Sequence, residues 1–289
     1  MFRWISLFLM AFVGSLQAQS NPGPFASFDL ASEAVLDDPH DLAFGPDGLL
    51  YVADKFGSRI AVFDPETLEL KHMLGEGQFP GVHDISFGPE GQVVVAVTGL
   101  SRVIVYLDFN DFPETPSYAI SATNTEGALA HSSGAIFAMA SGIGVLGKFS
   151  ETGMVGATEG LFGAHDVAEG LNGNIWVGDN RAGRLVGYDA DLKVLQTIDH
   201  SKFGFVGPRY LDVTDFGHLV VADQDAHRVL LIDPSGPDGG TLLGVLGTGA
   251  PGLGPGLFDD PEGVAVRGNR FFISDSDNNR IVRYSIVLN

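Results

Sequence analysis

Three histidines, each followed directly by an aspartate, are the residues of this chain best suited to chemistry. They are His40, His83 and His165, and each His-Asp pair precedes a run of small and apolar residues. Imidazole nitrogens bind Zn²⁺ and other divalent ions such as Fe²⁺ or Mn²⁺. The chain has no cysteine. Any metal must therefore be held by histidine, carboxylate or carbonyl oxygen, and disulfides and a cysteine nucleophile are excluded.

The same position occurs three more times in the chain, where it is occupied by Glu126, Arg209 and Glu262. The six positions, 40, 83, 126, 165, 209 and 262, are separated by 43, 43, 39, 44 and 53 residues. A repeat of this length is typical of propeller blades or of helical arrays. The carboxylate of Glu262 joins the three histidines as a predicted metal ligand.

Within one repeat the pattern is that of short strands. In the first repeat, apolar runs at 40–44, 49–53, 59–63 and 68–73 are rich in β-branched and aromatic residues and are separated by Gly, Pro and Asp. No helical periodicity of useful length is present, so four strands are favoured over two helices. Six repeats predict an all-β fold, a six-bladed β-propeller of four-stranded blades. The innermost strands line a central channel, so the six repeated positions should form a ring at its mouth.

The two ends of the chain are predicted to close this ring. The sixth repeat ends after its third strand, at 280–288, and residues 24–30 form a spare strand at the other terminus. Pairing the two removes an exposed sheet edge. In four repeats an aspartate is followed five positions later by an arginine, which predicts a structural pair at the turn between the second and third strands. These pairs are Asp54/Arg59, Asp179/Arg184, Asp223/Arg228 and Asp275/Arg280.

The N-terminal segment is predicted to direct export. Arg3 is followed by an apolar run at 5–13 and by small residues at 14–18, a pattern typical of a secretory signal peptide comprising residues 1–18. The alternative, an anchor helix, needs a longer apolar run of about 20 residues. Residues 19–289 are then a single propeller domain, periplasmic or secreted, with no membrane span.

The charge of the chain excludes other classes of partner. There are 16 Lys and Arg residues against 36 Asp and Glu residues, which gives a formal charge of −20. Phosphate contacts need clustered Lys and Arg, and the chain has no such cluster, so nucleic acid is excluded. An anionic membrane surface is disfavoured for the same reason. We expect a monomer that binds a small molecule or peptide at the channel mouth.

Parts of the chain resemble known families. The sequence Gly-Leu-Phe-Asp-Asp-Pro-Glu-Gly-Val-Ala-Val at 256–266 and the segment at 271–281 resemble an NHL repeat. In the first repeat, Pro-His-Asp-Leu-Ala at 39–43 and Tyr-Val-Ala-Asp at 51–54 resemble a zinc-ligand blade of the peptidyl-α-hydroxyglycine α-amidating lyases, which are six-bladed NHL propellers. This resemblance implies a zinc ion held on the channel axis by His40, His83 and His165, with nearby Tyr and Arg side chains performing the lyase chemistry.

Two arrangements of the metal ligands stay open. Alternate blades two, four and six contribute His83, His165 and Glu262, so Glu262 replaces one histidine of the family; otherwise His40, His83 and His165 hold the metal away from the axis. The tyrosine typical of the lyases has no evident counterpart, because Phe56 takes the comparable place in the first repeat.

The predicted function is that of an exported metal-dependent lyase acting on a small or peptide-terminal carboxylate substrate. Lys55 and Arg209 are the predicted catalytic residues, because their positive charges suit that carboxylate. The alternative is a non-catalytic propeller, a sensor or scaffold that binds a ligand or a protein through the same face. A third hypothesis is a gluconolactonase-like hydrolase, because Glu-Gly at 126–127 and at 262–263 is similar to the opening strand of that family.

Three smaller expectations concern acidic and histidine side chains. The aspartate after each ring histidine either orients the imidazole or serves its own blade. The acidic loops at 259–260 and 275–277 are candidates for structural Ca²⁺, with a solvated loop as the alternative. The other five histidines are expected at the surface, and they are His72, His131, His200, His218 and His227.

Overall fold

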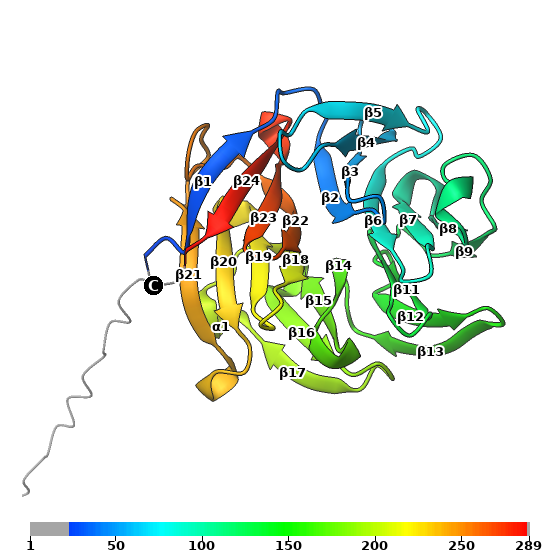
Figure 1. Cartoon of the computed structure of the whole chain (residues 1–289). Helices are drawn as coiled ribbons and strands as arrows, with labels where there is room; N and C mark the ends of the chain where they lie inside the picture. The colour runs from blue at the N-terminus through cyan, green and yellow to red at the C-terminus, as the bar shows by residue number, and fades with distance from the viewer. Residues whose placement is uncertain (1–22, 288–289) are drawn as a thin grey trace, which may run out of the picture.

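The computed structural model describes residues 23–287, which form six four-stranded antiparallel sheets arranged as blades around a channel (Figure 1). The predicted six-bladed propeller is therefore confirmed. The predicted signal peptide, residues 1–18, lies outside the described residues. In five blades the four strands follow in chain order from the channel outward, and the sixth takes its outer strand from the N-terminal end of the described chain.

The strands of the six blades are short and similar in length. Blades one and two contain β2 (Pro39–Phe44), β3 (Leu50–Asp54), β4 (Arg59–Phe63), β5 (Leu70–Leu74), β6 (Val82–Phe87), β7 (Val93–Val97), β8 (Arg102–Tyr106) and β9 (Tyr118–Ser121). Blades three and four contain β10 (Gly127–Ala130), β11 (Ile136–Ala140), β12 (Val145–Ser150), β13 (Gly153–Glu159), β14 (Ala164–Glu169), β15 (Ile175–Asp179), β16 (Arg184–Tyr188) and β17 (Val194–Ile198). Blades five and six contain β18 (Pro208–Val213), β19 (Leu219–Asp223), β20 (Arg228–Asp233), β21 (Thr241–Gly247), β22 (Pro261–Arg267), β23 (Arg270–Asp275), β24 (Arg280–Ile286) and β1 (Ala26–Ala31).

Helical structure in the described part of the chain is confined to single turns. The α-helix α1 (His200–Phe203) precedes β18. The 3₁₀ turns are η1 (Thr98–Leu100), η2 (Phe109–Asp111), η3 (Leu171–Gly173), η4 (Asn180–Ala182), η5 (Gln224–Ala226), η6 (Pro237–Gly239) and η7 (Ser276–Asn278). No helix among residues 23–287 is long and apolar enough to span a bilayer.

Burial follows the position of a strand within its blade. The second strand is covered on both faces by neighbouring blades, and β7, with the sequence Val-Val-Val-Ala-Val, is buried throughout. β-branched side chains fit a pleated surface that is packed on both sides. The outermost strands face solvent, and β13 has no buried residue. The apolar core therefore lies mainly between blades.

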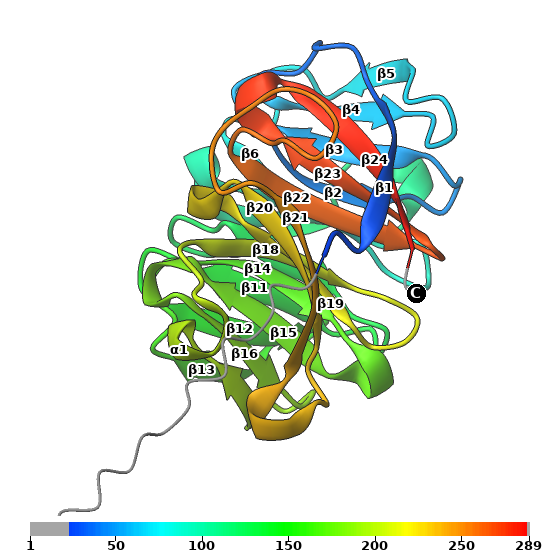
Figure 2. The same ribbon diagram turned by 90° about the vertical axis from the view of Figure 1, so that its left-hand side faces the viewer.

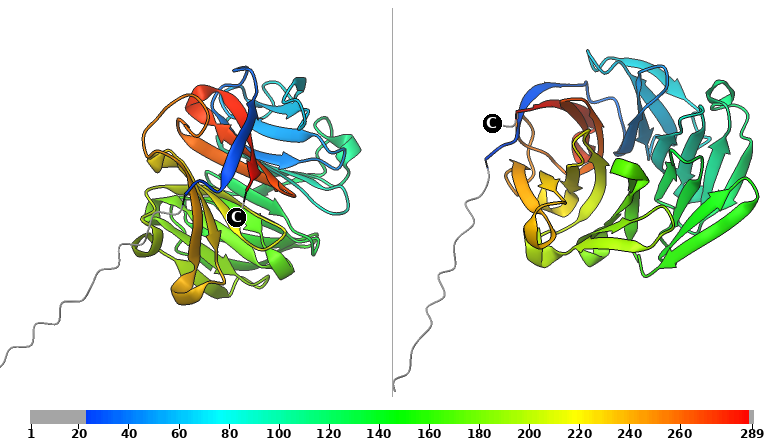
Figure 3. Two further views of the ribbon diagram at one scale, coloured as in Figure 1. Left: turned by 60° about the vertical axis from the view of Figure 1, so that its left-hand side comes forward. Right: turned by 60° about the horizontal axis from the view of Figure 1, so that its bottom comes forward.

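The N-terminal strand closes the ring, close to where the sequence predicts it. β1 pairs with β24 in an antiparallel register that sets Ala26 opposite Ile286, and the views in Figures 2 and 3 show the blue β1 alongside the red β24. The backbone N–H of Val287 donates to the carbonyl of Phe25 at 2.8 Å. The ring of Phe25 stacks on Phe271 of β23, with centroids 5.4 Å apart. This closure joins the first and last described segments in one sheet.

The four predicted Asp–Arg pairs all form. Each arginine Nε donates to a carboxylate oxygen of its aspartate at 2.7 or 2.8 Å. In blade five the other oxygen of Asp223 accepts the backbone N–H groups of Val206 and Gly207, at 2.9 and 2.7 Å. The pair therefore ties the turn after the second strand to the loop that enters the same blade.

Strand register decides which loops surround the ring positions. Pro39, at the start of β2, pairs with Asp54, at the end of β3, and Pro208 pairs with Asp223 in the same way. The loop that enters each blade and the turn between its second and third strands therefore lie at one end of the propeller. We call this end the site face.

Candidate functional site

The six ring positions lie at or just before the starts of the innermost strands, and five of them stand beside an irregularity in strand pairing. In blade one the register shifts between Pro39 and Leu42, and corresponding shifts occur at the starts of β6, β14, β18 and β22. Such bulges change the direction in which a side chain points. The shift thus frees the ring residue from the strict alternation of the strand.

A left-handed backbone residue stands two positions before most of these ring residues. The positive φ angles are 58° at Asp38, 63° at Gly81, 47° at Asn124, 88° at Gly163 and 57° at Asp260. Glycine, asparagine and aspartate adopt this conformation at the lowest cost. The repeated Asp, Gly or Asn at this position is therefore a sequence signal for the turn that aims the ring residue.

His83 and His165 are oriented by this turn. The Nδ1 atom of His83 lies 2.8 Å from the carbonyl oxygen of Gly81, and Nδ1 of His165 lies 2.8 Å from that of Gly163. A carbonyl accepts a hydrogen bond only, so Nδ1 carries the proton in both rings. In His83 the lone pair is then on Nε2, the arrangement that orients a metal-ligating histidine, whereas Nε2 of His165 faces the carboxylate of Glu126.

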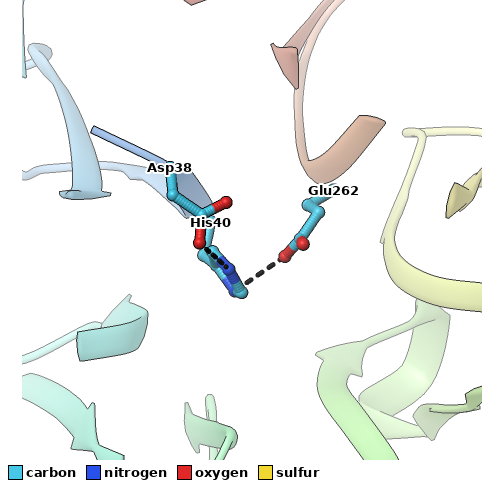
Figure 4. A group of neighbouring side chains, drawn as sticks. All are labelled: Asp38, His40 and Glu262. Atoms are coloured by element: carbon cyan, nitrogen blue, oxygen red, sulfur yellow. Dashed lines mark ion pairs between the residues drawn. The ribbon is translucent and has the colours of Figure 1, made fainter. Parts of the chain in front are cut away.

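Three of the donor groups on the site face converge closely (Figure 4). His40 Nδ1 lies 2.6 Å from Glu262 Oε2, and His40 Nε2 lies 3.4 Å from Asp38 Oδ2. One ligand atom from each of the three residues lies within 4.8 Å of those of the other two. This Asp38–His40–Glu262 cluster contains two of the four predicted ligands and adds Asp38, which the sequence did not indicate as one.

The remaining predicted ligands lie beside this cluster. The rings of His83 and His40 are 4.5 Å apart between centroids and meet edge to face. His165 Nε2 contacts the carboxylate of Glu126. The ring of predicted residues is thus assembled, but as one three-donor cluster flanked by His83 and by the His165–Glu126 pair.

Tyr210 is a member of the site that the sequence did not predict. It is fully buried, its hydroxyl lies 3.3 Å from His40 Nδ1, and it donates to the carbonyl of His83 at 3.2 Å. Burial raises the pKa of Tyr210 well above its ordinary value, so the phenol stays protonated. In the other repeats the position after the ring residue holds Asp or Gly, and an aromatic residue there was the available signal.

The two predicted catalytic residues flank the three-donor cluster. Lys55 Nζ donates to Asp38 Oδ2 at 2.8 Å, and a terminal nitrogen of Arg209 lies 3.4 Å from Glu262 Oε1. Gln224, another residue that the sequence did not predict, accepts from Arg209 at 2.5 Å and donates to Glu262 at 2.8 Å. Lys55, Arg209, Gln224, Asp38 and Glu262 all line one pocket of about 360 Å³ on the site face.

The charge states of the site suit metal binding. Burial alone raises the pKa of Asp38, but the hydrogen bonds and charges of His40 and Lys55 outweigh it and hold that pKa well below its usual range. Burial also raises the pKa of Glu126, but the hydrogen bond and charge of His165 outweigh this effect and lower that pKa to about 2. Burial lowers the pKa of both His83 and His165. Ionised carboxylates and neutral imidazoles are the forms that coordinate a cation.

Unsatisfied polar atoms provide the test of fit for a metal. His40 Nε2, Glu262 Oε2 and Glu126 Oε2 are buried and make no geometrically acceptable hydrogen bond within the described chain. Buried polar atoms are seldom left in this state. Nitrogen and carboxylate-oxygen donors in this combination suit Zn²⁺ and related divalent ions, so these residues fit such an ion.

The aspartates after the ring histidines serve the fold and not the imidazoles. Asp84 accepts the backbone N–H of Ala128 at 2.7 Å, and Asp166 accepts that of Leu211 at 2.6 Å. Each bond runs from one blade to the inner strand of the next. Burial raises the pKa of Asp166 to about 7. Of the two predicted roles, the structure favours the structural one.

Two other expectations have different outcomes. In the acidic loops the carboxylate of Asp275 accepts hydrogen bonds from Arg280 at 2.8 Å and from Asn278 at 3.0 Å. The Ca²⁺ site stays a prediction. The expectation that His131 lies at the surface is wrong. Only 2% of this residue is exposed, because its ring nitrogens bond to Ser133 and to the carbonyl of Gly173.

With this geometry described, the chain can be compared with known proteins. The NHL repeat family model matches residues 36–63 and 258–284, which lie in the first and last blades of this six-bladed β-propeller. No curated protein matches its sequence.

Solved structures match over most of the chain. Virginiamycin B lyase from Staphylococcus aureus is 10% identical, with a TM-score of 0.62, and the match covers 86% of this chain and 95% of that one. A protein of unknown function from Bacteroides thetaiotaomicron is 12% identical, with a TM-score of 0.70 and coverages of 92% and 73%. Hydrazine synthase from Kuenenia stuttgartiensis is 15% identical, with a TM-score of 0.63 and coverages of 87% and 78%. At these identities the likeness establishes the fold alone.

Proposed function

We propose that this protein is an exported metal-dependent lyase that acts on a small or peptide-terminal carboxylate substrate at the site face. The observation that carries the proposal is the convergence of Asp38, His40 and Glu262, with buried donor atoms that lack partners in the described chain. We infer that His40, Glu262 and Asp38 hold the ion and that His83 and His165 complete or support its environment.

Each group near the cluster has a role in this proposal. The ion, most simply Zn²⁺, supplies Lewis-acid activation of a substrate oxygen. Lys55 and Arg209 line the same pocket and bind the substrate carboxylate. Tyr210, protonated and within hydrogen-bond distance of His40, orients that imidazole and carries a proton beside it.

The metal content of ligand variants tests the proposal. The full-length chain, purified without a histidine tag, should contain about one equivalent of divalent metal by elemental analysis. His40→Ala and Glu262→Gln should lose most of it, because each removes a donor of the cluster. His72→Ala is the matched control, because His72 is exposed on the outer strand β5. Wild-type protein without stoichiometric metal, even after incubation with Zn²⁺, overturns the metal site.

Two further variants distinguish the possible ligand sets. If Asp38 is a ligand, Asp38→Asn lowers metal content while His165→Ala leaves it nearly unchanged. The reverse result supports a site on the axis, made by the histidines as the amidating-lyase resemblance implies. Export is tested separately, since a chain cleaved after residue 18 has the mass of residues 19–289.

A non-catalytic binding propeller is the second candidate. It is favoured by one observation: Lys55 and Arg209 already contact carboxylates of the chain itself, Asp38 and Glu262. If the chain binds peptide or small carboxylates but neither metal nor Glu262→Gln affects that binding, this second function is the correct one.

A further inference from the structure

Six loops of the site face carry one large apolar side chain each that is exposed to solvent. We call these residues the apolar rim, and they are Phe56, Leu100, Ile143, Phe162, Val206 and Leu253, between 44% and 67% exposed. The first three lie in turns between second and third strands, in blades one, two and three. The other three lie in the loops that enter blades four, five and six. By strand register, both kinds of loop surround the channel mouth.

Contacts show that the rim is attached to the site. Lys55 Nζ lies 4.6 Å from the centre of the Phe56 ring, and both residues line the 360 Å³ pocket together with Asp38 and Glu262. The loop of Leu253 is tied to blade six by a 3.0 Å hydrogen bond from Asn278 to Gly252. The rim therefore continues from the pocket onto the surrounding surface.

One rim residue also lies against the turn that carries another. A Cβ atom placed on Gly144 would lie 3.0 Å from the ring of Phe162, so Phe162 covers the glycine that directly follows Ile143. Exposed apolar side chains scattered singly need no explanation, but a set gathered around a polar pocket marks a binding surface.

The charges between the rim residues are mainly negative. Asp37, Asp225 and Asp277 are exposed on other loops of the site face, in blades one, five and six, and none of them forms an ion pair within residues 23–287. Arg102 and Arg181 are exposed basic residues of this face, while Lys55 is paired with Asp38. A ligand with basic groups between apolar ones complements this face, and the formal charge of −20 attracts it over a distance.

We propose that the site face binds a peptide with alternating apolar and basic side chains, whose carboxyl end enters the pocket beside Lys55 and Arg209. This inference rests on the proposed function, because it takes the pocket at Asp38, His40 and Glu262 as the place of reaction. It narrows the substrate class from any small carboxylate to an apolar, basic peptide. The pocket takes only the end of such a chain, and the rim contacts the residues before it.

Four dansyl-labelled peptides test the inference by fluorescence titration. They are Leu-Lys-Phe-Lys-Phe with a free carboxylate, its C-terminal amide, Ser-Lys-Ser-Lys-Ser, and Leu-Glu-Phe-Glu-Phe. The first should bind about tenfold or more tightly than each of the others, because each lacks one feature recognised by the face. Equal affinity for all four overturns the proposal.

Rim variants connect that preference to the structure. Phe56→Ser and Leu253→Ser should each weaken binding of the first peptide by about three- to tenfold and leave binding of the Ser-Lys peptide unchanged. Phe216→Ser is the matched control, because Phe216 is 80% exposed in the turn between β18 and β19, at the opposite end of the propeller. If Phe216→Ser has the same effect as the rim variants, the inference is wrong.

Metal content measured in the same preparations separates this inference from the proposed function. If the protein contains one equivalent of metal but binds all four peptides equally, the proposed peptide surface is wrong and the metal site is retained. Selective peptide binding without metal supports the peptide surface and overturns the metal-dependent lyase.

Discussion

At the scale of single residues, the site depends on which ring nitrogen of each histidine is free. The carbonyl oxygens of Gly81 and Gly163 accept hydrogen bonds from the Nδ1 atoms of the two histidines that follow them, His83 and His165. Each glycine lies two positions before its histidine, and its left-handed backbone directs the carbonyl toward the ring. In blade one the corresponding residue is Asp38. It adopts the same left-handed turn, and its carboxylate also contacts the ring of His40. A residue needed for backbone geometry in every blade thus becomes a candidate ligand in one.

Tyr210→Phe tests the residue at the centre of the ring. The substitution keeps the buried aromatic ring but removes the hydroxyl that contacts His40 and donates to His83. We expect a loss of about 1 kcal/mol in the free energy of unfolding, measured with urea, because one buried hydrogen bond is lost. Metal content should stay unchanged, since the phenol is not among the three converging donors. Loss of the metal in this variant would contradict that division of roles.

At the scale of elements, the inner strands are linked by carboxylates as well as by apolar packing. Asp212 in β18 accepts the backbone N–H of Val266 in β22 at 2.7 Å, as Asp84 and Asp166 do between other blades. These aspartates line the channel away from the site face, around a cavity of about 230 Å³. Each one bonds two inner strands that lack main-chain pairing with each other.

Asp212 also makes stability depend on pH. Burial raises its pKa from 3.8 to about 6, so the folded state binds more protons than the unfolded state between those values. The free energy of unfolding therefore falls as pH rises from about 4 to about 6. Because the Asp212 side chain is partly exposed, solvent screening reduces its contribution to that fall to about 1–2 kcal/mol.

Asp212→Asn should flatten this part of the pH profile by the same amount. Asp215→Asn, in the exposed turn that follows, is the control and should leave the slope as in the wild type. Urea unfolding at intervals between pH 4 and pH 7 measures both. An unchanged slope in Asp212→Asn would show that other carboxylates determine it.

The sequence predicts the elements well because the signal is repeated six times. A position that recurs every 39 to 53 residues, followed by four short apolar runs, leaves few folds other than a propeller, and the spare strand at 24–30 follows from counting strands. Contacts between side chains of the site could not be predicted in this way, because no local sequence pattern relates Glu262 to His40, or Arg209 to Gln224. Tyr210 and Asp38 each stood at a repeated position, but their roles depend on which blades are neighbours.

At the scale of the whole molecule, blade six is made from both ends of the described chain. Phe25, Phe258, Phe271 and Tyr284 are all buried in one apolar cluster there. Arg283 of β24 donates to Asp29 of β1 at 3.2 Å. The ring is therefore held closed by side chains as well as by the strand pairing.

Removing residues 19–31 should open this ring. The deletion exposes the edge of β24 and uncovers the cluster around Phe271, so we expect the melting temperature to fall by 10 °C or more, about the effect of several kcal/mol. Thermal unfolding followed by circular dichroism measures it. A deletion that ends at residue 22, before the described structure begins, is the control and should melt like the chain that begins at residue 19. An unchanged melting temperature after the longer deletion would rule out closure by β1.

This closure also sets the order in which the chain can fold during synthesis. Asp29 and Ser285, which share a 2.8 Å hydrogen bond, are 256 positions apart, so β1 has no partner until the final strand has been made. The five other blades can form one after another, but a product that stops before residue 280 retains one unpaired strand and one open sheet edge. Such products are prone to associate with one another, and completing the last blade is the step that ends this exposure.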